Sequence, residues 1–286
     1  MKITNINLIF LSVLMLALST STAIAKDDIA FLAIHNDYWQ VWLMKADGSN
    51  ARPVTDTSYD KSRISWYPNG DLLVNGNQGE LIRLSLKDKK ETSVKVPFKQ
   101  VNDAVVSPDG KYLAFSQKPE GAIYNKMWLM DIQSGHKIKV GWTKGFQHEP
   151  NFSPNSQVLY YLSGDNGQFH DIMKYTIKTK SIEPVTFSKL YNLDVALNPD
   201  NKIAFSSNRS GNYEIWMQDD SKLKKLTSHP ALDARPNWSL DGKKIYFESN
   251  RGGSLNIWSV NVDGIQNPEQ VTHHKEGARY PLWRTR

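Results

Sequence analysis

Two short marks repeat six times along this chain at nearly constant spacing, and they restrict the possible folds more than any other feature. The first mark is the apolar residue before a Ser-Pro-Asp-Gly-like turn, spaced 40, 46, 45, 41 and 45 residues apart: Trp66, Val106, Phe152, Leu197, Trp238 and Trp283. The second lies in an Ile-Trp-like segment, spaced 40, 46, 45, 43 and 42 residues apart: Trp42, Ile82, Trp128, Met173, Trp216 and Trp258. Internal periods of about 40 to 45 residues are typical of β-propellers.

Each unit predicts four short strands separated by tight turns. In the clearest copy, Asn237-Trp-Ser leads into Leu-Asp-Gly, where Asp starts a turn and Gly supplies the positive φ. Lys244 to Glu248 alternates and is rich in β-branched and aromatic residues, Leu255 to Val260 forms a third strand, and Gln270 to Thr272 a fourth. We therefore predict an all-β fold, a six-bladed β-propeller with four antiparallel strands per blade.

The two ends of the chain predict how the ring closes. Phe31 lies eleven residues before Trp42, as Phe247 lies before Trp258, so the N-terminal part begins at the second strand of a blade. The missing innermost strand is supplied by Ala278 to Arg284, which repeats the pattern of Ala234 to Ser239. One blade is thus expected to contain strands from both termini, which leaves no free sheet edge at the closure.

Residues 1 to 25 predict a cleaved signal peptide, and residues 26 to 286 the propeller domain. The segment has one charge, Lys2, then an apolar stretch from Leu8 to Leu18, and ends in Ala23-Ile24-Ala25. This stretch is too short to span about 30 Å of hydrocarbon, and no later segment is apolar enough, so no membrane span is expected. Export to the periplasm is predicted, with secretion as the alternative.

Composition excludes several classes of protein. The chain has no cysteine, which rules out disulfides, thiolate metal ligands and a cysteine nucleophile. Its 35 basic and 29 acidic residues give a net charge of only +6, without a run of five or more like charges, so nucleic-acid binding is not expected. We expect a monomer that carries no cofactor.

The repeat resembles that of the TolB-like propellers. The shared marks are Ser-Pro-Asp-Gly-Lys before an aromatic strand, Ser-Asn-Arg-x-Gly, Ile-Trp, and a closing threonine, here Thr55, Thr186, Thr227 and Thr272. The likeness covers nearly all of Ile29 to Trp283. It implies a six-bladed propeller of the bacterial envelope. TolB proteins also carry an α/β domain before the propeller and bind a peptidoglycan-associated lipoprotein. Only Lys26 to Asp28 lie between the predicted cleavage site and the first strand, so that domain, and with it the Tol-Pal role, is not expected.

A polar residue recurs three positions before each first mark, where the chain enters the innermost strands. These residues are Arg63, Asp103, Glu149, Asp194, Arg235 and Tyr280; with His148, Asp233 and Arg279 they form the predicted binding rim of the channel. One interpretation is a solvated rim whose charges pair with their neighbours. The other is a polar pocket or docking funnel for a partner.

Three functions remain open from the sequence. The first is a non-enzymatic scaffold of the cell envelope that binds a protein or peptide at this rim. The second is a channel-site enzyme, a metal-dependent polysaccharide lyase or lactonase-type hydrolase, using His148, Glu149 and Asp194, although no diagnostic metal spacing or Gly-x-Ser-x-Gly motif is present. The third is carbohydrate binding at Tyr280 and Trp39. We assign no catalytic residue and no metal ligand.

Two repeated residue types are expected to be structural. Trp42, Trp128, Trp216 and Trp258 occur once per unit, which favours packing between blades over a sugar-binding stripe. Arg209 and Arg251 share a place in the Asn-Arg-x-Gly turn, so we interpret them as arginines that hold this hairpin.

Overall fold

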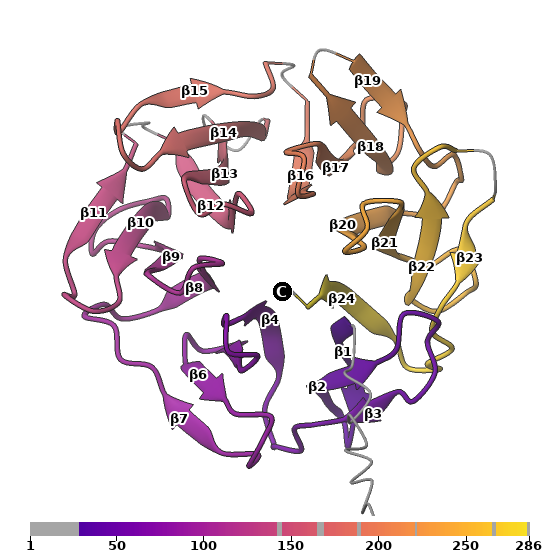
Figure 1. Cartoon of the computed structure of the whole chain (residues 1–286), viewed down its shortest axis with the longest axis horizontal. Coiled ribbons are helices and arrows are strands. Elements are labelled where there is room, and N and C mark those ends of the chain that lie inside the picture. The colour runs from indigo at the N-terminus through magenta and orange to yellow at the C-terminus, as the bar shows by residue number, and fades with distance from the viewer. Residues whose placement is uncertain are drawn as a thin grey trace, which may run out of the picture.

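The computed structural model describes residues 29–141, 145–164, 169–187, 190–220, 222–264 and 267–284. These residues form six four-stranded antiparallel sheets arranged as a ring around a central axis (Figure 1). The prediction of an all-β, six-bladed propeller is confirmed. The predicted signal peptide, residues 1 to 25, lies outside the described residues. Within the described ranges no helix is long and apolar enough to cross a bilayer.

Blades are numbered here in ring order, with strands given from the channel outward. Blade 1 consists of β24 (Ala278–Trp283), β1 (Ile29–His35), β2 (Tyr38–Met44) and β3 (Arg52–Pro53). Blade 2 consists of β4 (Lys61–Trp66), β5 (Leu72–Gly76), β6 (Leu81–Leu84) and β7 (Glu91–Ser93). Blade 3 consists of β8 (Val101–Val106), β9 (Tyr112–Gln117), β10 (Lys126–Asp131) and β11 (Lys137–Val140).

Blades 4 to 6 follow the same order. Blade 4 consists of β12 (Phe146–Phe152), β13 (Val158–Gly164), β14 (Asp171–Thr176) and β15 (Ile182–Pro184). Blade 5 consists of β16 (Asn192–Leu197), β17 (Ile203–Ser207), β18 (Glu214–Asp219) and β19 (Lys222–Lys225). Blade 6 consists of β20 (Asp233–Trp238), β21 (Lys244–Ser249), β22 (Asn256–Asn261) and β23 (Glu269–Gln270).

The two ends of the chain close the ring as predicted. β24 pairs antiparallel with β1, and Ile29 lies opposite Trp283 while Ala33 lies opposite Ala278. Two hydrogen bonds extend this contact to the neighbouring blades, from the Trp283 N–H to Asn237 Oδ1 at 2.8 Å and from Trp66 Nε1 to the Leu282 carbonyl at 3.3 Å. β24 therefore fastens blade 1 to blades 6 and 2.

The second strand of each blade is buried on both faces, because each sheet is covered by the blades on either side. β5 and β17 are buried along their whole length. In every blade the central residue of the second strand lies opposite the residue of the second sequence mark on the third strand. The pairs are Phe31 and Trp42, Val74 and Ile82, Phe115 and Trp128, Tyr161 and Met173, Phe205 and Trp216, and Phe247 and Trp258. Cross-strand pairs of this kind are a main source of sheet stability.

The hydrophobic core consists of six layers, one between each pair of adjacent blades. Ile29 and Phe31 of blade 1 pack with Tyr246 and Ile257 of blade 6, for example. Each repeated tryptophan packs against one of these layers. Trp42 contacts the layer between blades 6 and 1, Trp128 that between blades 2 and 3, Trp216 that between blades 4 and 5, and Trp258 that between blades 5 and 6. The expectation that they pack between blades is confirmed.

The closing threonines share one hydrogen-bond arrangement. Thr227 Oγ1 accepts the Ile215 N–H at 2.9 Å and donates to Glu214 Oε2 at 2.7 Å. The other three threonines make the same two bonds to the third strand of their own blades: Thr55, Thr186 and Thr272. The Thr mark of the repeat therefore ties the connection between blades to the third strand.

The inner strands all carry a break in register that turns one side chain toward the channel. In five blades the residue at the break has a left-handed backbone with φ between 50° and 61°: Asp103, Glu149, Asp194, Arg235 and Tyr280. In blade 2 the shift falls at Ser62, next to Arg63. Bulges of this type bend a strand and redirect its side chains. The polar residues predicted for the rim therefore lie inside the inner strands.

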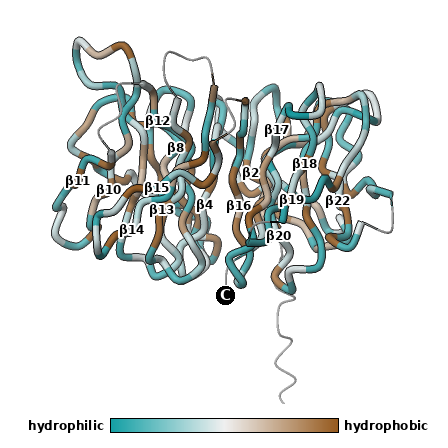
Figure 2. The backbone as a smooth tube through the Cα atoms, turned by 90° about the horizontal axis from the view of Figure 1, so that it is seen from above, coloured by the Kyte–Doolittle hydropathy of each residue, from teal (hydrophilic) through white to brown (hydrophobic). Residues whose placement is uncertain are grey.

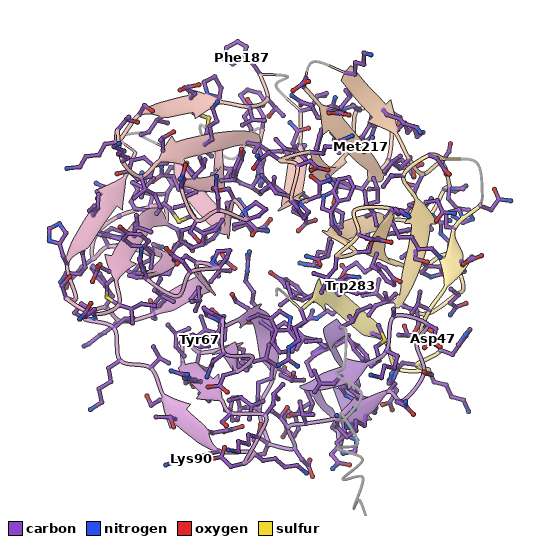
Figure 3. All side chains as sticks on the ribbon, viewed as in Figure 1. Asp47, Tyr67, Lys90, Phe187, Met217 and Trp283 are labelled. Carbon is purple, nitrogen blue, oxygen red and sulfur yellow. The ribbon has the colours of Figure 1, made fainter. Side chains whose placement is uncertain are left out.

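Two faces of the disc are defined by the direction of the inner strands. We call the face where they begin the upper face and the face where they end, beside the C-terminus, the lower face (Figure 2). The six residues of the first sequence mark stand at the lower end of these strands, as Trp283 does on β24 near the centre of the ring (Figure 3).

Deleting residues 278 to 286 tests the closure. The deletion removes the β24–β1 ladder, whose backbone hydrogen bonds contribute about 1 kcal/mol each. It also removes the apolar contacts of Leu282 and Trp283, and complete burial of such a side chain contributes roughly 1.5–3 kcal/mol. We expect the melting temperature to fall by at least about 10 °C, measured by circular dichroism. Deleting only residues 285 and 286 is the control. Equal melting of the full chain and the longer deletion would contradict closure by β24.

Candidate functional site

Six side chains of the inner strands meet in the central channel. Arg63, Asp103, Glu149, Asp194, Arg235 and Tyr280, which we call the channel cluster, line one cavity of about 120 Å³. The sequence grouped these six residues, and the structure brings them together. The cavity is smaller than the roughly 300–1,000 Å³ of most small-molecule sites. It suits a small polar group better than a whole sugar residue.

Two carboxyl groups of the cluster and the adjacent Glu248 accept hydrogen bonds from backbone N–H groups of the next blade. Glu149 Oε2 accepts the Asp194 N–H, and Asp194 Oδ2 accepts the Arg235 N–H, both at 3.2 Å. Glu248 Oε2 accepts the Tyr280 N–H at the same distance. In each case the donor is a bulge residue, whose N–H is removed from its own ladder. The carboxylates thus satisfy donors that the bulges leave without a strand partner.

Two arginines and a tyrosine complete the cluster. Arg235 Nη1 lies 2.5 Å from Glu248 Oε1, and its Nε 3.8 Å from Asp194 Oδ1. Arg63 Nη2 donates to the Pro150 carbonyl at 2.7 Å, and its Nη1 lies 3.9 Å from Asp103 Oδ1. Both guanidinium groups lie beside the Tyr280 ring, at 5.6 and 5.7 Å from its centroid. The charges of the cluster are therefore largely paired with one another.

The two neighbouring carboxyl groups, Asp194 and Glu149, differ in pKa because His148 hydrogen-bonds only one of them. Burial, and after it the nearby Glu149 carboxylate, raises the pKa of Asp194 to about 7. Burial alone would also raise the pKa of Glu149, but a hydrogen bond from His148, with the positive charges of His148 and Arg63, lowers it to about 2. Such a split is the expected behaviour of two acidic groups in close proximity.

An aromatic wall lies above the cluster at the upper end of the channel. We call it the aromatic ledge; it consists of Tyr124, Phe146, His148, His170 and Tyr191, with successive ring centroids 4.5–6.3 Å apart. His148 Nδ1 lies 3.5 Å from Glu149 Oε1, which joins the ledge to the cluster. Burial lowers the pKa of His170 to about 4, and its Nδ1 has no hydrogen-bond partner among the described residues.

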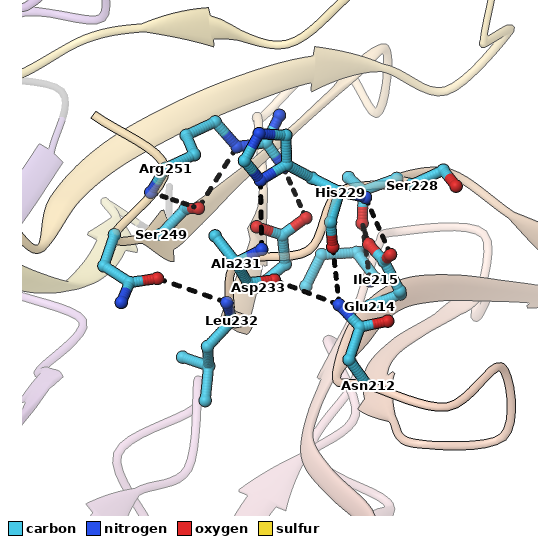
Figure 4. Close-up of polar contacts among 12 residues, drawn as sticks. Asn212, Glu214, Ile215, Ser228, His229, Ala231, Leu232, Asp233, Ser249 and Arg251 are labelled. Atoms are coloured by element: carbon cyan, nitrogen blue, oxygen red, sulfur yellow. Dashed lines mark hydrogen bonds and ion pairs between the residues drawn. The ribbon is translucent and has the colours of Figure 1, made fainter. Parts of the chain in front are cut away.

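Two residues of the predicted rim have other surroundings. Asp233 is fully buried and pairs with Arg251, whose Nη2 lies 2.5 Å from Asp233 Oδ2 (Figure 4). Arg251 also donates to Ser249 and stacks beside Phe247 and Trp258, which confirms its structural role in the hairpin. Arg279 lies over the Trp39 ring at 4.0 Å. Neither Asp233 nor Arg279 lines the cavity of the channel cluster.

Arg209 plays the same part in blade 5. Its Nε donates to Ser207 Oγ at 3.0 Å and its Nη2 to Asn192 Oδ1 at 2.9 Å. Its guanidinium carbon lies 5.1 Å from the ring centroids of both Phe205 and Trp216. The Asn-Arg-x-Gly turn thus covers the aromatic pair of its blade with a cation. As expected, both arginines hold structure.

The described residues contain no group of three His, Asp or Glu side chains placed to hold a metal ion. His148 and Glu149 face each other, but Glu149 also accepts the Asp194 N–H, and Asp194 accepts the Arg235 N–H and the Ser206 hydroxyl. A metal at these three residues would have to replace hydrogen bonds that connect blades.

A second and much larger cavity opens at the lower face, which the sequence analysis missed. Its volume is about 990 Å³, and all six residues of the first sequence mark line it: Trp66, Val106, Phe152, Leu197, Trp238 and Trp283. In the sequence these six residues serve only to establish the repeat. Their common position at the end of an inner strand was the signal that they would surround one opening.

No family model matches the chain. An uncharacterized protein of Agrobacterium fabrum is 31% identical over 191 residues, which is 63% of this chain and 63% of that protein. An uncharacterized peptidase of Bacillus subtilis is 28% identical over 142 residues, 48% of this chain and only 20% of the peptidase. The chain thus spans less than two thirds of each of these relatives.

Solved structures resemble the whole ring. TolB from Acinetobacter baumannii has a TM-score of 0.79 at 20% identity, covering 90% of this chain and 66% of that one. The chain has the TolB-like propeller fold. A putative TolB from Agrobacterium tumefaciens has a TM-score of 0.71 at 24% identity, covering 86% of this chain and 89% of that one. An oligogalacturonate lyase from Vibrio parahaemolyticus shares the TolB-like ring more distantly, at 0.58 and 11%, covering 86% of this chain and 74% of that one.

The raised pKa of Asp194 predicts a pH dependence of stability. The pKa of Asp194 is about 7 in the folded state and near 3.8 in the unfolded state, so the folded chain binds a proton at this carboxyl group more tightly than the unfolded chain does. The stabilisation is full below about pH 4 and is lost as pH rises through 7. We expect Asp194→Asn, which keeps an oxygen acceptor, to reduce the loss in free energy of unfolding between pH 5 and pH 8 by at least about 1 kcal/mol.

Denaturant titrations at both pH values measure this effect. Asp103→Asn is the matched control, since Asp103 occupies the same bulge position in blade 3. An unchanged pH dependence in Asp194→Asn would contradict the assignment of this proton to Asp194.

Proposed function

We propose that this chain is an exported propeller of the bacterial envelope that binds a protein or peptide partner on its upper face, without catalysing a reaction. The partner would lie along the aromatic ledge and reach the channel cluster with a polar group. The observation that carries this proposal is the ledge itself, an apolar and aromatic surface that leads to a charged pocket too small for a typical substrate.

Exposed apolar side chains extend the ledge outward. Ile123, next to Tyr124 in the loop between β9 and β10, is 77% exposed, and Phe187 in the connection from β15 to β16 is 85% exposed. Phe187 projects from the edge of the ring (Figure 3). Exposed apolar surface with polar groups beside it is typical of protein-binding sites. Aromatic residues are also enriched at such interfaces.

The resemblance to TolB proteins favours an envelope partner. It is consistent with export of the chain through residues 1 to 25, with a periplasmic location and with a soluble monomer that neither spans a membrane nor binds nucleic acid. The partner's identity and any Tol-Pal role are separate questions, because the similarity at 20–24% identity concerns the fold.

Site-specific cross-linking tests the docking surface. A photoreactive benzoyl-phenylalanine at position 123 should capture a partner in the periplasm of living cells, whereas the same group at position 132 should not. Ile132 is also exposed, at 41%, but lies at the other end of β10. Capture from both positions, or from neither, would contradict docking on the upper face.

Binding of the captured partner can then be measured with purified proteins. Each apolar side chain buried in a complex contributes roughly 1.5–3 kcal/mol, so the double variant Ile123→Asp/Phe187→Asp should weaken binding at least about tenfold. The matched control is Ile132→Asp/Leu223→Asp, whose residues are 41% and 43% exposed outside the ledge. Equal losses in both double variants would overturn the assignment. Variants of Asp194 or Arg235 are less informative, since these residues also connect blades.

The enzymatic alternative is retained because lyases share the ring. It would need a metal at His148, Glu149 and Asp194, and a metal that binds only the folded state raises its stability. If the scaffold proposal is correct, protein purified without chelator should contain less than about 0.1 metal ion per chain and melt at the same temperature with and without EDTA. Stoichiometric metal, or a chelator-dependent melting temperature, would favour the enzyme.

A further inference from the structure

We infer that the cavity on the lower face is a binding site for a single-chain anionic amphiphile, such as a long-chain fatty acid. This inference is independent of the proposed partner on the upper face. The cavity, of about 990 Å³, has the size of a small-molecule site rather than of a packing defect. Such sites are usually apolar with a few polar groups that fix the orientation of the ligand.

The walls are apolar and repeat around the axis. Below the ring of first sequence marks, one further apolar residue from each of four consecutive blades lines the opening: Pro108, Pro154, Pro199 and Leu240. Leu240 is 36% exposed at the mouth. The two adjoining cavities share four lining residues, Ser65, Asn151, Asn237 and Leu282. The three polar side chains among them hydrogen-bond the backbone of the next blade, so mainly polar groups mark the boundary between the cavities.

Charge is distributed unequally around this cavity. Three cations line it on blades 6 and 1: Lys243, Lys244 and Arg284. Lys244 pairs with Glu269, at 3.6 Å, and the Arg284 guanidinium lies 5.0 Å from the Trp66 ring. The lining has a single acid, Asp241, whose carboxylate accepts the Ser239 hydroxyl and the Lys243 N–H. The opposite side, on blades 3 and 4, has no charged residue in the lining, and its one polar side chain, Asn151, donates to the Val195 carbonyl.

This asymmetry assigns an orientation to the ligand. An apolar chain would lie against Val106, Phe152 and Pro154, while an anionic head group would face Lys243 and Arg284. A neutral lipid would gain the apolar contacts alone, and a cationic amphiphile would be repelled from the charged side. The cavity therefore selects for an anionic head.

Fluorescence quenching by 9,10-dibromostearate tests the inference. Bromine quenches tryptophan at short range, and Trp66, Trp238 and Trp283 line the cavity. We expect saturable quenching with one fatty acid per chain, below its critical micelle concentration. Leu240→Asp, which places an acid in the apolar mouth, should weaken binding at least about tenfold. The matched control is Leu232→Asp, since Leu232 is 40% exposed but precedes β20 at its upper end.

The head group is tested by charge reversal. Lys243→Glu should weaken binding of the fatty acid about tenfold but change binding of the matching neutral monoacylglycerol less than about twofold. Lys111→Glu is the control, because Lys111 holds the same place in the Ser-x-Asp-Gly-Lys turn of blade 3, makes the same backbone bond to its aspartate, and lies outside the cavity.

Three results would overturn the inference. They are the absence of saturable quenching, equal losses in Leu240→Asp and Leu232→Asp, and equal losses for the neutral and anionic lipids in Lys243→Glu. Sedimentation of each variant shows that it remains folded and in the same oligomeric state. A change of oligomeric state in Leu240→Asp without lipid binding to the original chain would instead assign the cavity to a second copy.

Discussion

The burial of every blade on both faces is the constraint on which the rest of this structure depends. A four-stranded sheet with a fully apolar second strand, such as β5 or β17, cannot be stable in water with either face uncovered. Each blade is covered only by its two neighbours, so a row of blades would leave two apolar faces exposed at its ends. The β24–β1 pairing joins these ends and brings the layer of Phe31, Tyr246 and Ile257 into existence.

Closing a ring of twisted sheets also determines the chemistry of its centre. Six inner strands converge on one axis, and each relieves its geometry with a break in register. The break turns a side chain into the channel and takes a backbone N–H out of the ladder. A carboxylate on the preceding blade accepts that N–H in three places, through Glu149, Asp194 and Glu248. The polar cluster is therefore a consequence of closure before it is a site for any ligand.

Much of the fold could be predicted because it repeats. Six copies of two marks gave the number of blades, and the phase difference between the two ends gave the closure. The structural role of Arg251 followed from its shared turn with Arg209, and its stacking on Phe247 and Trp258 bears this out.

The details of the site depended on features that do not repeat in sequence. Left-handed backbone at Glu149, Arg235 or Tyr280 has no sequence signal, since glycine is the residue that normally marks it. The predicted rim therefore lies inside the strands. The sequence places Asp233 in the predicted rim because it lies two residues before Arg235. In the structure Asp233 faces Arg251, since the register shift between Ala234 and Asn237 gives Asp233 and Arg235 different surroundings. The lower cavity has no signal beyond the repeat itself, because an apolar residue that recurs once per blade can either fill the core or surround the channel.

The same repeat therefore serves different purposes at the two ends of the channel. At the upper end the connections between strands differ in length and composition from blade to blade, so Tyr124, His170 and Tyr191 come together on blades 3 to 5 without any symmetry. At the lower end five of the six inner strands lead into the same kind of tight turn, and six equivalent apolar residues produce a nearly regular funnel. Irregular connections can recognise an irregular partner such as a protein surface. A regular apolar funnel can discriminate only by size and by the few residues that break its symmetry, which here are the cations of blades 6 and 1.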